Sequence, residues 1–133
     1  LPDFINNTDS MFIDVHGNQT QLLAWSKCFI KSNMDCATCH NTHENERGNI
    51  TLYNERCKTC HTTTEHNLTA NGSMQLNKFI NNNCVNCHMP TQSSKKIIMQ
   101  TSGSGSMFSA AAVNHRIAVY SEETNRIMKL FHN

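Results

Sequence analysis

Six of the seven cysteines stand in pairs with two residues between them, and a histidine follows each pair directly. The three segments are Cys36-Ala-Thr-Cys39-His40, Cys57-Lys-Thr-Cys60-His61 and Cys84-Val-Asn-Cys87-His88. Cys-x-x-Cys-His is the attachment signature of a c-type haem: the two thiols bond to the porphyrin and the adjacent imidazole is directed at the iron. We therefore expect three haem c groups, attached through Cys36, Cys39, Cys57, Cys60, Cys84 and Cys87, with His40, His61 and His88 as the proximal iron ligands.

Zinc sites and disulfides also use paired cysteines, but neither accounts for the histidine after each pair. A zinc site takes four ligands in tetrahedral geometry and does not require a histidine directly after its second cysteine. A disulfide framework requires no histidine. Because the histidine recurs in all three segments, the spacing favours haem attachment over both alternatives.

Five further histidines are available for the second axial position of the three irons. We expect distal ligands among His16, His43, His66 and His115, whereas His132 is interpreted as a solvated tail residue. An iron with two imidazoles is six-coordinate and suited to electron transfer, whereas an iron with an open face can bind and transform a substrate. The surplus of histidines therefore favours electron transfer over catalysis.

Three sulfur-containing residues outside the motifs leave alternatives open. Cys28 is the odd thiol, and it can be a buried reduced thiol, an intersubunit disulfide partner or a thiolate ligand. Met99 and Met107 are alternative axial ligands, although methionine more often fills a core.

The composition limits the size class and the partners of the chain. Its 133 residues make one ordinary domain, with 38% hydrophobic and 7% aromatic residues, which predicts a thin protein core. Three porphyrins, one for about 44 residues, would supply the missing apolar volume. The formal net charge of +1, without a basic or acidic run, argues against a nucleic-acid partner. No apolar stretch approaches the length of a transmembrane helix.

The elements that position the motifs are predicted to be short. We expect a mostly irregular fold organised by haems, with short α-helices and little or no β structure. Helices are predicted over 20–31, in one or two turns from Ser73 to Ile80, and over 121–131. Residues 97–99 and 117–120 are expected to form no more than short strands, and 102–106 to form a flexible Gly/Ser loop.

The domain organisation follows from the position of the motifs. We expect one trihaem domain over 1–133, with an N-terminal arm over 1–35, a haem-attachment region over 36–90, and a C-terminal wrap and helix over 91–133. The links between successive motifs are short, so the three haems are expected to lie near one another.

The first two motifs, Cys36-Ala-Thr-Cys39-His40-Asn-Thr-His43 followed by Cys57-Lys-Thr-Cys60-His61, resemble the doubled pattern of multihaem c-type cytochromes. The segment from Cys84 to Pro90, with the later Asn114-His115-Arg116-Ile117-Ala118, is similar to the C-terminal part of exported members of that group. The resemblance implies closely stacked haems with two axial histidines each. It also implies that His43 and His115, together with His16 and His66, are distal ligands, and that the protein is exported and passes electrons.

Members of that group often carry more than three haems, and four distal candidates exceed the need of three irons. Either the chain is part of a larger cytochrome, or one histidine reaches a haem in a neighbouring subunit. The second arrangement resembles extracellular cytochrome filaments, and His16 in the N-terminal arm would be the natural donor.

The leading hypothesis is an electron-transfer protein rather than an enzyme, with redox proteins and further copies of itself as partners. Thioether attachment follows export, and the sequence opens at Leu1-Pro2, which fits a processed chain. We therefore expect an extracellular or cell-surface location, or otherwise a periplasmic one. The alternative is a small oxidoreductase that reduces a nitrogen or sulfur oxyanion at one open haem, with Arg116, Lys95 and Lys96 as the nearest positive groups by sequence.

Overall fold

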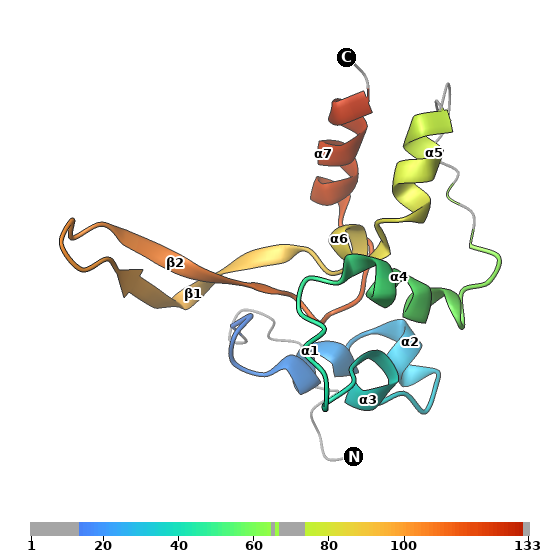
Figure 1. Ribbon diagram of the computed structural model, residues 1–133, viewed down its shortest axis with the longest axis horizontal. Helices are drawn as coiled ribbons and strands as arrows, with labels where there is room; N and C mark the ends of the chain where they lie inside the picture. The colour runs from blue at the N-terminus through green and yellow to red at the C-terminus, as the bar shows by residue number, and fades with distance from the viewer. Residues whose placement is uncertain (1–13, 65, 67–73, 132–133) are drawn as a thin grey trace. The chain divides into compact units, whose positions relative to one another are not determined.

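The computed structural model describes residues 14–64, 66 and 74–131, which form seven helices and one two-stranded sheet (Figure 1). The elements are α1 (Gln19–Ala24), α2 (Lys27–Ile30), α3 (Cys36–Cys39), α4 (Ile50–Lys58), α5 (Met74–Asn81), α6 (Cys84–His88), β1 (Thr91–Gln100), β2 (Met107–Val113) and α7 (Ser121–Phe131). None of these helices is long and apolar enough to cross a membrane.

The described residues fall into two compact units. The first comprises 14–33 and 89–118, with α1, α2 and the sheet, and the second comprises the described residues of 34–88 together with 119–131. All three Cys-x-x-Cys-His segments belong to the second unit. The expectation of a single trihaem domain concerns the loaded protein and stays a prediction.

The sheet corrects the predicted fold class. β1 and β2 pair antiparallel, from Thr91 opposite Val113 to Gln100 opposite Met107. The expectation of a mostly irregular chain with little or no β structure is therefore wrong, because the chain is a small mixed structure of short helices and one hairpin. The short strand expected at 97–99 is confirmed as the end of β1, whereas the polar composition of its first six residues, Thr-Gln-Ser-Ser-Lys-Lys, obscured the rest of the strand.

The Gly/Ser segment, expected to be a flexible loop, is the turn of this hairpin. Gly103 and Gly105 have φ angles of 102° and 69°, which side-chain-bearing residues rarely adopt. The amide of Thr101 donates a hydrogen bond of 3.0 Å to the carbonyl of Ser106 and closes the turn. Glycine therefore provides a defined reversal of the chain here, rather than flexibility alone.

The Asp14 carboxylate stabilises a register shift in β1 at Ser94. It accepts hydrogen bonds from the Ser94 hydroxyl at 2.8 Å and from the amides of Lys95 at 2.8 Å and Lys96 at 3.2 Å. The backbone hydrogen bond from His16, and then those from Ser94, Lys95 and Lys96, lower the pKa of Asp14 to about 2. The segment that contains His16 is thereby anchored to the hairpin of its own unit.

The helix predicted over 20–31 is interrupted at Ser26. This residue is fully buried and has an extended backbone between α1 and α2. Its hydroxyl accepts a hydrogen bond of 2.8 Å from the amide of Ile117 and donates one of 3.4 Å to the carbonyl of His115. The predicted strand over 117–120 is also wrong, because the Ile117 amide bonds to Ser26 instead of a neighbouring strand.

The predicted helices near Ser73 to Ile80 and over 121–131 are confirmed as α5 and α7, which run side by side (Figure 1). Ser73, the expected N-cap of the first, lies outside the described residues. Leu76 and Ile80 of α5 pack with Ile127 of α7 in a small core, and the half-buried side chains of Phe79, Cys87, Met128 and Phe131 surround it. The third cysteine pair therefore contacts the main apolar cluster of its unit.

Candidate functional site

Each of the three Cys-x-x-Cys-His segments forms one helical turn. The first pair of cysteines spans α3, the second begins at the end of α4, and the third lies in α6. The amide of His40 donates to the carbonyl of Cys36 at 2.9 Å, and that of His61 donates to Cys57 at 3.0 Å. Residues three apart on a helix share a face, so both sulfurs of a pair lie on one side of their turn.

Local capping residues explain why the first two turns form where they do. Asp35 accepts a hydrogen bond of 2.9 Å from the Thr38 amide, and the Thr38 hydroxyl accepts one of 3.0 Å from the Asp35 amide, which makes a capping box at the start of α3. Asn49 caps α4, because its side chain accepts a hydrogen bond of 3.2 Å from the amide of Leu52. Gly48, with φ of 81°, brings the chain to that cap.

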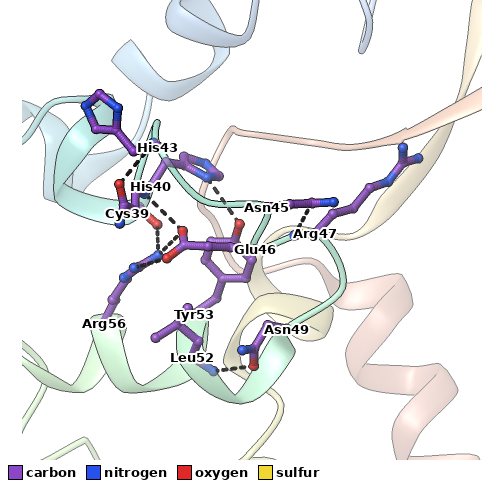
Figure 2. Close-up of polar contacts among 11 residues, drawn as sticks. Cys39, His40, His43, Asn45, Glu46, Arg47, Asn49, Leu52, Tyr53 and Arg56 are labelled. Atoms are coloured by element: carbon purple, nitrogen blue, oxygen red, sulfur yellow. Dashed lines mark hydrogen bonds and ion pairs between the residues drawn. The ribbon is translucent and has the colours of Figure 1, made fainter.

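Tyr53 in α4 contacts the proximal histidine of the first motif. Its hydroxyl oxygen lies 3.2 Å from Nδ1 of His40, and the two rings meet edge to face with centroids 5.3 Å apart (Figure 2). The hydrogen bond that one imidazole nitrogen makes determines which nitrogen binds a metal. In the tautomer in which Nδ1 of His40 carries the proton, it donates to the Tyr53 oxygen and leaves the lone pair for a metal on Nε2.

Arg56, which directly precedes Cys57, joins α4 to the end of the first motif. Its guanidinium forms a bidentate ion pair with Glu46 and donates a hydrogen bond of 2.6 Å to the carbonyl of Cys39 (Figure 2). Glu46 also accepts a hydrogen bond of 2.9 Å from the amide of Asn41. The hydrogen bond from Arg56, and then that from Asn41, lower the pKa of Glu46 to about 2, while Glu46 raises the pKa of Arg56.

Asn54 joins the same helix to the third motif. Its side chain is buried, with 3% of the residue exposed. The side-chain nitrogen of Asn54 donates a hydrogen bond of 2.5 Å to the carbonyl of Asn82. Its side-chain oxygen accepts a hydrogen bond of 3.2 Å from the backbone amide of Val85, within α6. Tyr53, Asn54 and Arg56 are successive or near-successive residues, so α4 carries the second motif and fixes the other two from one segment.

The donor set of this unit fits haem c. Its six cysteines are thiols that form no disulfide, and they lie in three pairs, each one turn apart. The contact of Tyr53 at Nδ1 of His40 leaves Nε2 as the nitrogen that could bind a metal. Within the described residues, no three His, Cys, Asp or Glu side chains gather as a metal-binding group. A haem iron takes at most two axial ligands from the protein, because the porphyrin provides the other four donors.

No protein-family model, curated protein or solved structure matches this chain. The resemblance to multihaem cytochromes therefore stays an expectation. The assignment of the site depends on the motifs and on the contacts around them.

Among the expected distal ligands, His66 and His43 lie in the same unit as the motifs. The rings of His66 and His88 have centroids 6.1 Å apart and an interplanar angle of 37°. Burial, and then the nearby His88, lower the pKa of His66, which favours its neutral form. His43 is exposed in a turn after α3 rather than in a continued helix, and its ring points away from the contact of His40 with Tyr53 (Figure 2).

His16 and His115 belong to the first unit. Nδ1 of His115 lies 3.2 Å from the carbonyl of Val113, so this nitrogen donates the hydrogen bond and the lone pair of the neutral ring lies on Nε2. Nδ1 of His16 is buried, makes no hydrogen bond within the described residues, and lies 3.6 Å from the Asp14 carboxylate. Both rings keep the donor chemistry of an axial ligand, and their assignment to an iron stays a prediction.

The remaining sequence candidates also lie in the first unit. The Arg116 guanidinium lies 5.8 Å from the centre of the Trp25 ring, and Lys95 and Lys96 donate their amides to Asp14. Met99 and Met107 lie in the hairpin, with 42% and 69% of each residue exposed, so neither fills a core. Cys28 is half-buried in α2, and its carbonyl accepts a hydrogen bond from Ser32.

The sequence reasoning missed the side chains that connect the motifs, which are Glu46, Tyr53, Asn54 and Arg56. A signal for two of them was available, because Tyr53 and Arg56 lie four and one residues before Cys57 and share a helical face. Their partners, His40 and Glu46, are not encoded in any local pattern. Asn54 lies among polar neighbours, and nothing in the sequence marks it as buried.

Proposed function

We propose that this protein transfers electrons through three covalently attached c-type haems. The observation that supports this best is the set of three Cys-x-x-Cys-His segments, each formed as a helical turn and all joined through α4. Bound there, haem would supply iron centres that take up and release single electrons. The six paired cysteines would hold the groups, and His40, His61 and His88 would bind the irons.

The side chains around the motifs hold the histidine and cysteine ligands in place. Tyr53 orients the His40 ring through Nδ1. The ion pair between Arg56 and Glu46 fixes the end of the first motif against the helix that leads into the second. Supporting contacts of this kind hold metal ligands in their working geometry and tune the metal.

Four histidines are available as second axial ligands for three irons, which supports six-coordinate irons. Six-coordinate irons favour electron transfer over catalysis. In this proposal His16, His43, His66 and His115 are the candidate second ligands. Other redox proteins would be the partners. Because thioether attachment follows export, we place the protein outside the cytoplasm, at the cell surface or beyond it, or otherwise in the periplasm.

The proposal extends to a homopolymer in which one axial histidine crosses between subunits. It is supported by the surplus of candidates over irons and by Nδ1 of His16, which is buried and makes no hydrogen bond within the described residues. We expect His16→Ala to leave one haem five-coordinate and to abolish assembly, as measured by electron microscopy and the optical spectrum of the ferric protein. Filaments that persist with an unchanged spectrum would contradict this extension.

The optical spectrum of the haem-loaded protein tests transfer against catalysis. We expect the reduced protein to show only low-spin bands and to leave its spectrum unchanged under carbon monoxide, because both axial positions of each iron are filled. Rapid carbon monoxide binding at one haem, with turnover of nitrite, hydroxylamine or tetrathionate, would contradict electron transfer as the function.

A further inference from the structure

The imidazoles of His66 and His88 lie close together at the third motif. Their ring centroids are 6.1 Å apart, with an angle of 37° between the ring planes. The chain between them includes α5, so the proximity comes from folding and not from sequence adjacency. The third motif thus has a second histidine beside its proximal one.

This separation matches two imidazoles on opposite sides of one metal ion. A metal lies about 2.0–2.1 Å from a bound imidazole nitrogen, and the ring centre lies about 1 Å behind that nitrogen, so the two centroids are expected about 6 Å apart. The observed 6.1 Å agrees with this value. A packing contact between two rings would not require this separation.

A second observation points to a ligand at this place. Nδ1 of His66 is buried and has no hydrogen-bond partner within the described residues. A buried polar atom without a partner requires an explanation, and a missing ion or ligand is one of the few. Cys87 of the same motif packs against the apolar core of Leu76, Ile80 and Ile127, so the third attachment site borders this core.

We propose that His66 and His88 are the two axial ligands of the iron attached through Cys84 and Cys87. The inference rests on the proposed haem attachment and adds the identity of one distal ligand. It distinguishes His66 from His43 of the same unit, for which the described residues show no contact with a proximal histidine.

The test is His66→Ala in the full chain with its haems attached. We expect the mass of the intact variant to show three haems, and the electron paramagnetic resonance spectrum of its ferric form to gain a high-spin signal from one haem of three. The matched control is His132→Ala, which should remain entirely low-spin. A His66→Ala variant without a high-spin signal would overturn the pairing.

A second variant shows which haem His66 binds. In a Cys84→Ser/Cys87→Ser variant, which lacks the third attachment site, adding His66→Ala should create no further high-spin signal. A high-spin signal that still appears on adding His66→Ala would show that His66 serves another iron. If wild-type protein itself carries no haem by mass, the proposed function fails, and that outcome is distinct from failure of the pairing.

A conservative substitution tests the assignment even if the Cys84→Ser/Cys87→Ser variant does not fold. His66→Met keeps a side chain that can bind iron, so the haem should stay six-coordinate while its midpoint potential rises, as it does when methionine replaces histidine as an axial ligand. We expect one of the three potentials to rise. Three unchanged potentials would contradict the assignment.

Discussion

At the scale of single residues, the hydrogen bond between Tyr53 and His40 connects structure to redox chemistry. A partner that accepts the Nδ1 proton of a metal-bound imidazole raises the basicity of the ring, and a more basic ligand stabilises the oxidised metal. The distance of 3.2 Å places the Tyr53 oxygen in that role.

We therefore expect Tyr53→Phe to raise the midpoint potential of one haem of three without loss of haem. A spectroscopic redox titration measures the potentials, and mass spectrometry of the intact chain counts the haems. Tyr120→Phe is the matched control, since it removes the other tyrosine hydroxyl of the chain. Equal potentials in the Tyr53 variant and the wild type would contradict the role of the hydroxyl.

The carboxylate of Glu46 makes stability depend on pH in a defined direction. Its pKa is about 2 in the folded chain against an ordinary value of 4.5. A lowered folded-state pKa stabilises the fold above the unfolded pKa, and this contribution is lost as the pH falls through the folded pKa. Stability should therefore decrease between about pH 5 and pH 2.

Glu46→Gln should flatten this acid dependence, because the amide does not titrate. Denaturant midpoints measured at several pH values give the slope. Part of the slope will remain, since Asp14 has a pKa lowered in the same direction. Thr42→Ala, in the same segment before α4, is the control, because its side chain does not titrate, and it should keep the wild-type slope. An unchanged slope in the Glu46 variant would contradict the contribution of the ion pair.

At the scale of elements, α4 is the part of the structure on which the site depends most. Its contacts through Tyr53, Asn54 and Arg56 reach the first and third motifs, and its own end carries the second. The nine-residue helix has little apolar character to anchor it. Its position is therefore set mainly by polar contacts. Those of Asn54 and Arg56 are buried or half-buried, and that of Tyr53 is exposed.

Removing the Asn54 side chain should expose this dependence. Asn54→Ala leaves the Asn82 carbonyl and the Val85 amide without their partner, and an unsatisfied buried group costs about 1–3 kcal/mol. We expect the free energy of unfolding to decrease by about this amount in chemical denaturation. The exposed Asn77→Ala is the control in α5. A loss equal to that of the control would contradict the role of Asn54.

The helices α5 and α7 could be predicted from the sequence because their apolar residues recur with helical spacing. Of the hairpin, only the short strand at 97–99 could be predicted, because the rest of β1 is rich in Ser and Lys and β2 contains three consecutive alanines. Its stability comes from the glycine turn and from the distant Asp14. Ser26 similarly divides a predicted helix through contacts to residues about 90 positions away.

At the scale of the whole molecule, the motifs can be recognised in the sequence, whereas the contacts that connect them cannot. The spacing of cysteine and histidine is a local property, whereas the approach of His66 to His88 depends on the fold. Among the described residues of the second unit, the buried apolar side chains are those of Leu76, Ile80, Val85 and Ile127. Such a core is small, and porphyrins would enlarge it.

We therefore expect the chain to lose cooperative folding when its haems are absent. Protein produced without the thioether-forming machinery should show a broad thermal transition by calorimetry, whereas the loaded protein should show a sharp one. Cys28→Ser with haems attached is the control, because it alters a cysteine outside the three motifs. A haem-lacking chain that unfolds as sharply and at the same temperature would contradict a haem-organised fold.

The most direct test of the central claim is the mass of the intact protein matured under conditions that permit thioether formation. The account predicts the polypeptide mass plus three haems, retained after denaturation because the bonds are covalent. Each double Cys→Ser substitution in one motif should remove one haem and leave two. A mass equal to that of the polypeptide alone would contradict the account.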